Sequence, residues 1–309
     1  MKFQWQGVFP AITTKFTADG ALDFSTFNKN IQAQLDAGID GLILGGSLGE
    51  SSTITHEERI DLLQNTLDFV QGKIPVLINI AEGSTRNAIK LAQLAQENGA
   101  DGLMVLPPMM YKPTDHETTE YFKTIASETD LPILIYNNPV DYKINVTLEM
   151  FDELLKHDNI QAVKESTRDV SNVTRIINYF GDRLKMLCGV DTLALECLLM
   201  GAHGWVAGLV CAFPRETVAI YRLAKAGKIE EARAIYRWFL PILELDINPQ
   251  LVQNIKLAES MTGIGTEHVR APRQPLMGAE RARVIKILET GLANRPELPE
   301  YLNLELAKS

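Results

Sequence analysis

The sequence predicts a (β/α)8 TIM barrel with a C-terminal helical extension. Eight short apolar runs recur along the first two thirds of the 309 residues, and segments with a helical period separate them. Each run is rich in Val, Ile and Leu on both faces, as is typical of parallel strands that helices cover on both sides. Because no linker or low-complexity segment interrupts this alternation, the strands and helices are expected to form one barrel.

The eight expected strands are short, and several end in glycine or polar residues. An open, doubly wound sheet is the alternative architecture, because eight parallel strands need not close into a barrel. The runs are Gly7–Phe16, Gly38–Ser47, Ile74–Ala81, Ala100–Pro108, Leu131–Pro139, Ile160–Thr167, Leu184–Asp191 and Gly201–Val210.

The segments between these runs carry helix-start signals. Thr55 with Glu58 and Thr114 with Glu117 fit the capping-box pattern, in which the first side chain and the fourth close the exposed amides of a helix start. Strand signals cease after the eighth run, so the catalytic barrel is expected to span residues 1–225. A helical region is expected over 226–309, from the segments 228–245, 249–263 and 278–292.

The composition narrows the class of partner. Lys and Arg number 30 against 39 Asp and Glu, so the net charge is −9, and nucleic acid is not an expected partner. No apolar run reaches the roughly 18 residues of a membrane span, so a cytoplasmic protein without a membrane partner is expected. The three cysteines lack CxxC spacing and are expected in the core, and the scattered histidines indicate no metal site.

Lys164 lies at the end of the sixth apolar run, "IQAVKEST". Active sites of barrels lie at the carboxyl ends of the strands. A lysine among apolar walls loses stability in its charged form, its pKa falls, and its free amine can attack a carbonyl carbon. The alternative is that Lys164 pairs with Glu165 or extends out of the barrel mouth.

Residues at two other strand ends favour the interpretation of Lys164 as a nucleophile. Tyr136 in "YNNP" could stand beside the amine and transfer protons, although a packing role is the alternative. The turn "GGSLGES" offers backbone amides and the Ser47 hydroxyl to a carboxylate, although a plain strand-to-helix turn would also use these glycines.

With these motifs, the sequence resembles the dihydrodipicolinate synthase and N-acetylneuraminate lyase family over nearly the whole chain. The resemblance implies that Lys164 forms a Schiff base with a 2-oxo acid, that Tyr136 relays protons, and that Ser47 with the Leu48 amide binds the carboxylate. It implies a small-molecule substrate, no cofactor and a homo-oligomer, either a tetramer or a dimer. The expected substrate-binding residues are Gly46, Leu48, Met110, Asn138, Asp141, Val206 and Gly208.

The sequence also departs from the synthase pattern. Asp141 stands where synthases usually carry the arginine that binds the carboxylate of aspartate semialdehyde, and an aspartate there is expected to repel that carboxylate. Met110 stands where synthases carry a relay tyrosine from a neighbouring subunit, a role for which Tyr111 is a candidate substitute. Such a pocket looks more like that of the branch that deaminates 1-pyrroline-4-hydroxy-2-carboxylate. The alternatives are dihydrodipicolinate synthase or another pyruvate-dependent aldolase and, more remotely, a barrel that binds a 2-oxo acid without turnover.

Overall fold

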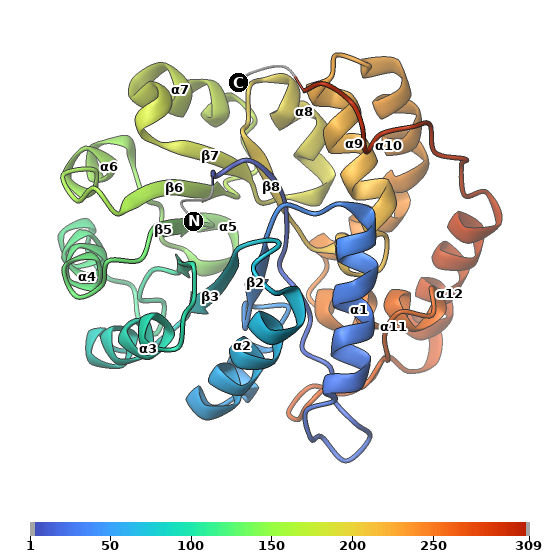
Figure 1. The fold of residues 1–309 in the computed structure, drawn as a ribbon, viewed down its shortest axis with the longest axis horizontal. Helices are drawn as coiled ribbons and strands as arrows, with labels where there is room; N and C mark the ends of the chain where they lie inside the picture. Colours follow the sequence, from blue (N-terminus) through green and yellow to red (C-terminus); the bar gives the residue numbers. More distant parts are fainter. Residues whose placement is uncertain (1–3, 307–309) are drawn as a thin grey trace.

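The computed structural model describes residues 4–306 and contains eight parallel strands in one sheet, surrounded by helices (Figure 1). The order of the strands around the sheet is β1-β8-β7-β6-β5-β4-β3-β2. The prediction of a (β/α)8 barrel is therefore confirmed. The strands are β1 (Gly7–Pro10), β2 (Leu42–Leu44), β3 (Val76–Ile80), β4 (Gly102–Val105), β5 (Ile133–Asn137), β6 (Ile160–Glu165), β7 (Lys185–Cys188) and β8 (Gly204–Ala207).

The sheet closes between its first two strands. β1 pairs with β8 along its length, and just beyond β1 a parallel bridge joins Ala11 to Ile43 of β2. The amide of Ile12 donates to the Ile43 carbonyl at 3.1 Å. Because this contact brings the two ends of the strand order together, the alternative of an open, doubly wound sheet is wrong.

Helices follow the strands around the outside of the barrel. Both predicted capping boxes are present, at the start of α2 and of α4. A four-residue helix, α5, follows β5 and precedes the longer α6. The helices up to the end of the eighth unit are α1 (Phe24–Ala37), α2 (His56–Val70), α3 (Thr85–Glu97), α4 (Asp115–Ser127), α5 (Pro139–Tyr142), α6 (Leu148–Leu154), α7 (Ser171–Phe180), α8 (Ala194–Leu199) and α9 (Pro214–Lys225).

The core of the protein is the barrel with the inner faces of its helices. Nearly every strand residue is buried, in agreement with the apolar character of both faces of the runs. Cys188, Cys197 and Cys211 are buried and free of disulfides, as expected for core cysteines. Among the described residues, no helix is long and apolar enough to cross a membrane.

Three helices follow the barrel: α10 (Ile229–Leu243), α11 (Leu251–Met261) and α12 (Gly278–Ala293). Figure 1 shows them beside α9 and α1, on one side of the barrel. Between α10 and α11 a short 3-10 turn, Glu244–Ile247, brings the chain back to the barrel mouth. The predicted boundary at residue 225 coincides with the end of α9, but whether the two parts fold separately stays a prediction.

Candidate active site

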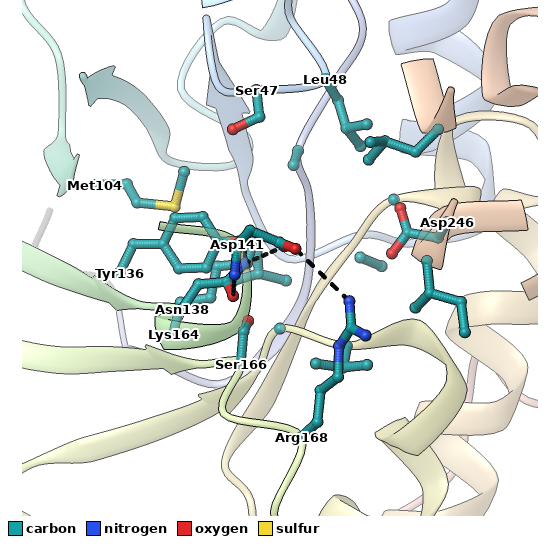
Figure 2. A pocket seen from close by; sticks show the side chains of 18 residues that line it. Ser47, Leu48, Met104, Tyr136, Asn138, Asp141, Lys164, Ser166, Arg168 and Asp246 are labelled. Atoms are coloured by element: carbon teal, nitrogen blue, oxygen red, sulfur yellow. Dashed lines mark hydrogen bonds and ion pairs between the residues drawn. The ribbon is translucent and has the colours of Figure 1, made fainter. Parts of the chain in front are cut away.

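A cavity opens at the carboxyl ends of the strands, where the sequence predicts the active site (Figure 2). Its empty space, counted together with the solvent at its open mouth, is about 630 Å³. The lining comes from strand ends, from the turn after β2 and from the 3-10 turn that precedes α11. The helical extension therefore forms part of the wall.

Lys164 is buried at the bottom of this cavity. It is the register partner of Tyr136 on the neighbouring strand, and its Nζ lies 4.1 Å from the centre of the tyrosine ring. Burial lowers the pKa of the Lys164 amine, although the nearby Tyr142, Asp246 and Asp191 oppose this shift. The amine is thus held closer to its neutral, nucleophilic form than an exposed lysine would be.

The two alternatives for Lys164 are wrong. The carboxylate of Glu165 accepts hydrogen bonds from the Thr167 amide at 2.7 Å and from Asn137 Nδ2 at 3.2 Å. It therefore does not pair with Lys164, as expected for successive residues on opposite faces of a strand. Lys164 is only 7% exposed, so its side chain does not extend out of the barrel mouth.

Gly189, at the end of β7, makes room for the lysine. A Cβ at this position would lie 2.7 Å from both Cγ and Cε of Lys164 and 2.2 Å from the hydroxyl oxygen of Ser166. Only a residue without a side chain leaves the lysine in its present place.

Tyr136 contributes both its ring and its hydroxyl to the site. Its hydroxyl accepts a hydrogen bond from Asn138 Nδ2 at 3.0 Å. Burial raises the pKa of the Tyr136 phenol to about 12, so the group remains protonated near neutral pH and can donate. The same Asn138 caps α5 by accepting from the Asp141 amide at 3.1 Å, and this links the tyrosine to the start of that helix.

The glycine-rich turn forms another side of the cavity. Ser47 and Leu48 line it, and the Ser47 hydroxyl lies 2.6 Å from the hydroxyl of Tyr142. The turn is held from outside: the Arg59 guanidinium donates to the Gly45 carbonyl at 2.9 Å, and Lys256 Nζ donates to the Glu50 carboxylate at 2.5 Å. The turn is therefore firmly supported, which suits the binding of a carboxylate.

The outer end of the cavity is charged. Arg168 Nη2 lies 3.8 Å from Asp141 Oδ1, and the carboxyl group of Asp246 faces the same space (Figure 2). Arg168 has a φ of 63°, which is unusual for a residue with a side chain and is most often retained at functional sites. Burial and the neighbouring Asp191 raise the pKa of Asp246 well above its usual value.

Asp191 holds the turn that follows β8, close to Asp246. Its carboxylate accepts from the Gly208 and Leu209 amides, at 3.1 Å and 2.7 Å, and from Trp205 Nε1 at 2.9 Å. These bonds fix the turn after β8. Val206 in β8 and Gly208 in this turn both border the cavity.

Most of the predicted site residues meet at this cavity, namely Ser47, Leu48, Tyr136, Asn138, Asp141, Lys164, Val206 and Gly208. Gly46 belongs to the same turn but is not part of the lining. Met110 lies outside the lining, with 77% of its surface exposed, as does Tyr111 with 57%. Substrate contact by Met110 therefore stays a prediction.

Sequence reasoning missed several residues of the site. Asp246 comes from the helical extension, and no strand-end pattern marks it. Arg168 directly follows the run "IQAVKEST", and Tyr142 lies three residues after "YNNP". Their nearness in sequence to Lys164 and Tyr136 was the signal that could have found them. Among the described residues, no group of three or more His, Cys, Asp or Glu side chains is arranged to hold a metal ion.

Comparisons with known proteins agree with this fold. A model of the dihydrodipicolinate synthetase family matches residues 4–291. The chain is 33% identical to a 4-hydroxy-tetrahydrodipicolinate synthase of Exiguobacterium sibiricum, over 93% of this chain and 97% of the relative. A second such synthase, of Haloarcula marismortui, is also 33% identical, over 87% of this chain and 88% of the relative.

Solved structures are similar over the same span. A dihydrodipicolinate synthase from Aquifex aeolicus has a TM-score of 0.88 at 29% identity, and the match covers 93% of this chain and 98% of the other. A prophage protein of the dihydrodipicolinic acid synthase family from E. coli K12, solved in complex with pyruvate, has a TM-score of 0.87 at 28% identity, covering 93% and 99%. The chain therefore belongs to the dihydrodipicolinate synthetase family and is an enzyme of that family.

Proposed function

We propose that this enzyme is a Schiff-base lyase in which the Lys164 amine bonds to the carbonyl carbon of a 2-oxo acid. The observation that carries the proposal is the position of the amine: it is buried, it has no carboxylate partner in an ion pair among the described residues, and it borders the cavity at the barrel mouth. A neutral lysine in such a place is a nucleophile toward carbonyl carbon.

The glycine-rich turn supports a carboxylate beside the reacting carbon. The hydroxyl of Ser47 faces the cavity together with Leu48, and the backbone of a tight turn presents amides that suit an anion. The related E. coli protein was solved with pyruvate, a 2-oxo acid, and this favours the same class of substrate here.

For the reaction type, the relatives favour condensation of pyruvate with an aldehyde such as aspartate semialdehyde. The relatives from Exiguobacterium sibiricum and Haloarcula marismortui are both 4-hydroxy-tetrahydrodipicolinate synthases, and none of those reported above is named a deaminase. The repulsion expected from Asp141 is also reduced, because the guanidinium of Arg168 lies beside it and offers a positive charge to a second carboxylate. A pyruvate-dependent synthase or aldolase is thus the first reaction to test.

Deamination of 1-pyrroline-4-hydroxy-2-carboxylate is the second candidate. It is favoured by Asp246, whose carboxyl group faces the cavity and whose raised pKa favours the protonated form. A protonated carboxyl group at that place is suited to donate a proton to a departing hydroxyl. Opening of the ring with hydrolysis would release ammonia and 2,5-dioxopentanoate.

The test starts with covalent trapping. The protein is incubated with pyruvate and sodium borohydride, and peptide mass spectrometry locates the reduced adduct; we expect it on Lys164. An adduct on another residue, or none, would contradict the proposal. Turnover is then measured with pyruvate plus aspartate semialdehyde and, separately, as ammonia release from the cyclic imine. The substrate that is consumed identifies the reaction type, and trapping without any turnover would instead favour the non-catalytic binding barrel.

We also propose a homo-oligomer in the cytoplasm. Large apolar side chains are exposed on the β4–α4 connection, at Met110 and Tyr111, and around the end of α8, at Leu199 and Met200. Such side chains are typical of surfaces that meet another subunit. A related solved structure is described as a monomeric dihydrodipicolinate synthase variant, so light scattering of the purified protein is the appropriate measurement.

A further inference from the structure

Tyr142 is a phenol beside the reactive lysine that the mechanism above does not use. It ends the four-residue helix α5, it is half-buried, and its ring meets that of Tyr136 edge-on, with the ring centres 5.6 Å apart. Its hydroxyl oxygen lies 2.6 Å from that of Ser47. Burial raises the pKa of the Tyr142 phenol to about 12, so it carries its proton near neutral pH.

The contact between these hydroxyls determines where the Ser47 proton points. Two hydroxyl groups in direct contact share one hydrogen bond, and only one of the two protons lies between the oxygens. A phenol is a stronger acid than an aliphatic alcohol and is the better donor, so Tyr142 donates and Ser47 accepts. The proton of Ser47 is then free for a second acceptor, and the side chain that carries it lines the cavity.

The charge on the lysine is coupled to the same phenol. A positive charge on Lys164 acts to lower the pKa of Tyr142, and the phenol in turn acts to raise the pKa of the lysine. A cationic nitrogen at this position therefore stabilises a transient phenolate on Tyr142. The cationic imine formed on Lys164 during Schiff-base formation would carry such a charge.

We propose that Tyr142 is the proton source behind Ser47, and that together they supply the proton that departs with water when the Schiff base forms. This inference rests on the proposed function, because it requires a 2-oxo acid bonded to Lys164. Tyr142 acts through Ser47 and is therefore a positioning and proton-supplying residue. The whole arrangement lies within a single chain.

Formation of the Schiff base through Ser47 and Tyr142 conserves atoms and charge. Lys164 Nζ adds to the carbonyl carbon, and after proton transfer from nitrogen to oxygen the product is a neutral carbinolamine. Ser47 then gives its proton to the carbinolamine hydroxyl while Tyr142 gives its own proton to Ser47. The carbon–oxygen bond breaks, water leaves, and the nitrogen lone pair forms the C=N bond. A cationic imine on Lys164 and a phenolate on Tyr142 remain, until the phenolate takes a proton from solvent.

The principal experiment measures the rate of adduct formation in Tyr142→Phe, which keeps the ring and removes only the hydroxyl. Protein is mixed with pyruvate, quenched with borohydride at successive times, and the reduced adduct on Lys164 is quantified. We expect a rate about 10²-fold below wild type, the scale of a lost acid–base group, with the same final extent of labelling. A wild-type rate in this variant would overturn the inference.

The dependence on pH separates a proton source from a merely structural role. Without Tyr142, solvent must supply the proton, so the ratio of wild-type to variant rate is expected to increase as the pH is raised from 6 to 9. A ratio that stays constant across this range would contradict a role in proton supply. Because the Tyr142 phenol also acts to raise the pKa of Lys164, each rate is first divided by the fraction of neutral Lys164 measured in the same protein.

A double-mutant cycle tests the path through Ser47. If Tyr142 acts only through that hydroxyl, Tyr142→Phe in the background of Ser47→Ala is expected to cause no further loss of rate. Losses that multiply would contradict the path.

Two phenol-to-phenyl changes serve as controls. Tyr179→Phe removes an exposed hydroxyl that donates to Asp152, and it is expected to leave the rate unchanged. Tyr111→Phe is expected to do the same; a large loss there combined with none in Tyr142→Phe would assign the relay to Tyr111 and overturn the inference. If wild type itself forms no adduct with pyruvate, the proposed function fails, and this inference fails with it.

Discussion

Two buried lysines lie against aromatic rings in this protein, and the one on β6 borders the cavity at the barrel mouth. Lys164 Nζ lies 4.1 Å from the ring centre of Tyr136, and Lys256 Nζ on α11 lies 4.6 Å from that of Phe16. Burial lowers the pKa of both amines, that of Lys256 to about 8. A lowered pKa is therefore not what distinguishes them.

The difference lies in the partners. Lys256 Nζ donates to the Glu50 carboxylate at 2.5 Å and to the His268 carbonyl at 2.7 Å, so its hydrogens are engaged on both sides. Lys164 forms no ion pair with a carboxylate of the described residues and borders open space. Burial makes an amine easier to deprotonate, but access to a substrate and freedom from a carboxylate partner make it a nucleophile.

The largest expected effect comes from removing each amine in turn. Lys164→Ala should abolish borohydride trapping and lower kcat by at least about 10³-fold, because the covalent step has no substitute. Lys256→Ala should still be labelled on Lys164 by pyruvate, at a temperature where it is folded. Peptide mass spectrometry of both variants measures the reduced pyruvate adduct. Labelling that survives in Lys164→Ala would place the nucleophile elsewhere.

The second test concerns stability, for which Lys256 is expected to matter. Lys256→Met leaves the Glu50 carboxylate buried without its closest cation, and we expect the free energy of unfolding to fall by about 3 kcal/mol. Chemical denaturation measures this loss. The matched control is Lys185→Met, which breaks a surface pair with Asp182 and should change stability by less than about 0.5 kcal/mol. Equal effects of the two changes would mean that the buried pair does not stabilise the turn.

A third test concerns the aromatic partner of the reactive amine. Tyr136→Phe keeps the ring under Lys164 and removes the hydroxyl that Asn138 contacts. We expect the pyruvate adduct to form, with kcat lowered by about 10²-fold and KM nearly unchanged, because only proton transfer is impaired. Steady-state kinetics provide the measurement, and wild-type kcat would exclude Tyr136 from the chemistry.

The smallest expected effect is a shift in the pH dependence of the trapping rate on Lys164. The neutral amine is the nucleophile, so trapping should slow as the pH falls through the pKa of Lys164. Because burial lowers this pKa, the decline should begin at a lower pH than for an ordinary lysine, whose pKa is about 10.4. Initial trapping rates between pH 6 and 10 test this, and a rate that rises tenfold per pH unit up to pH 10 would contradict the lowered pKa.

Much of the barrel and its reactive rim could be predicted from the sequence, because both depend on local patterns. Apolar runs define parallel strands, and the last residue of a run lies at the barrel mouth. This rule predicts Lys164 and Tyr136 at the barrel mouth, and both line the cavity there. It could not reveal that they are register partners, because pairing between strands is a property of the closed sheet.

The rest of the site depends on contacts between distant segments. Asp246 reaches the cavity only because the chain returns after α10, and the Arg168 pair with Asp141 depends on how two loops fold over the opening. The expectation that Asp141 repels a second carboxylate considered that residue alone. Its neighbouring guanidinium changes the local charge, which one motif could not indicate.

The return of the chain after α10 also has a consequence for engineering. A protein truncated after Lys225 would retain all eight strands and the reactive amine, but it would lack Asp246 in the cavity wall and the Lys256 support behind the glycine turn. Exchanging tails between relatives is therefore expected to change one wall of the cavity and leave Lys164 in its place in the barrel.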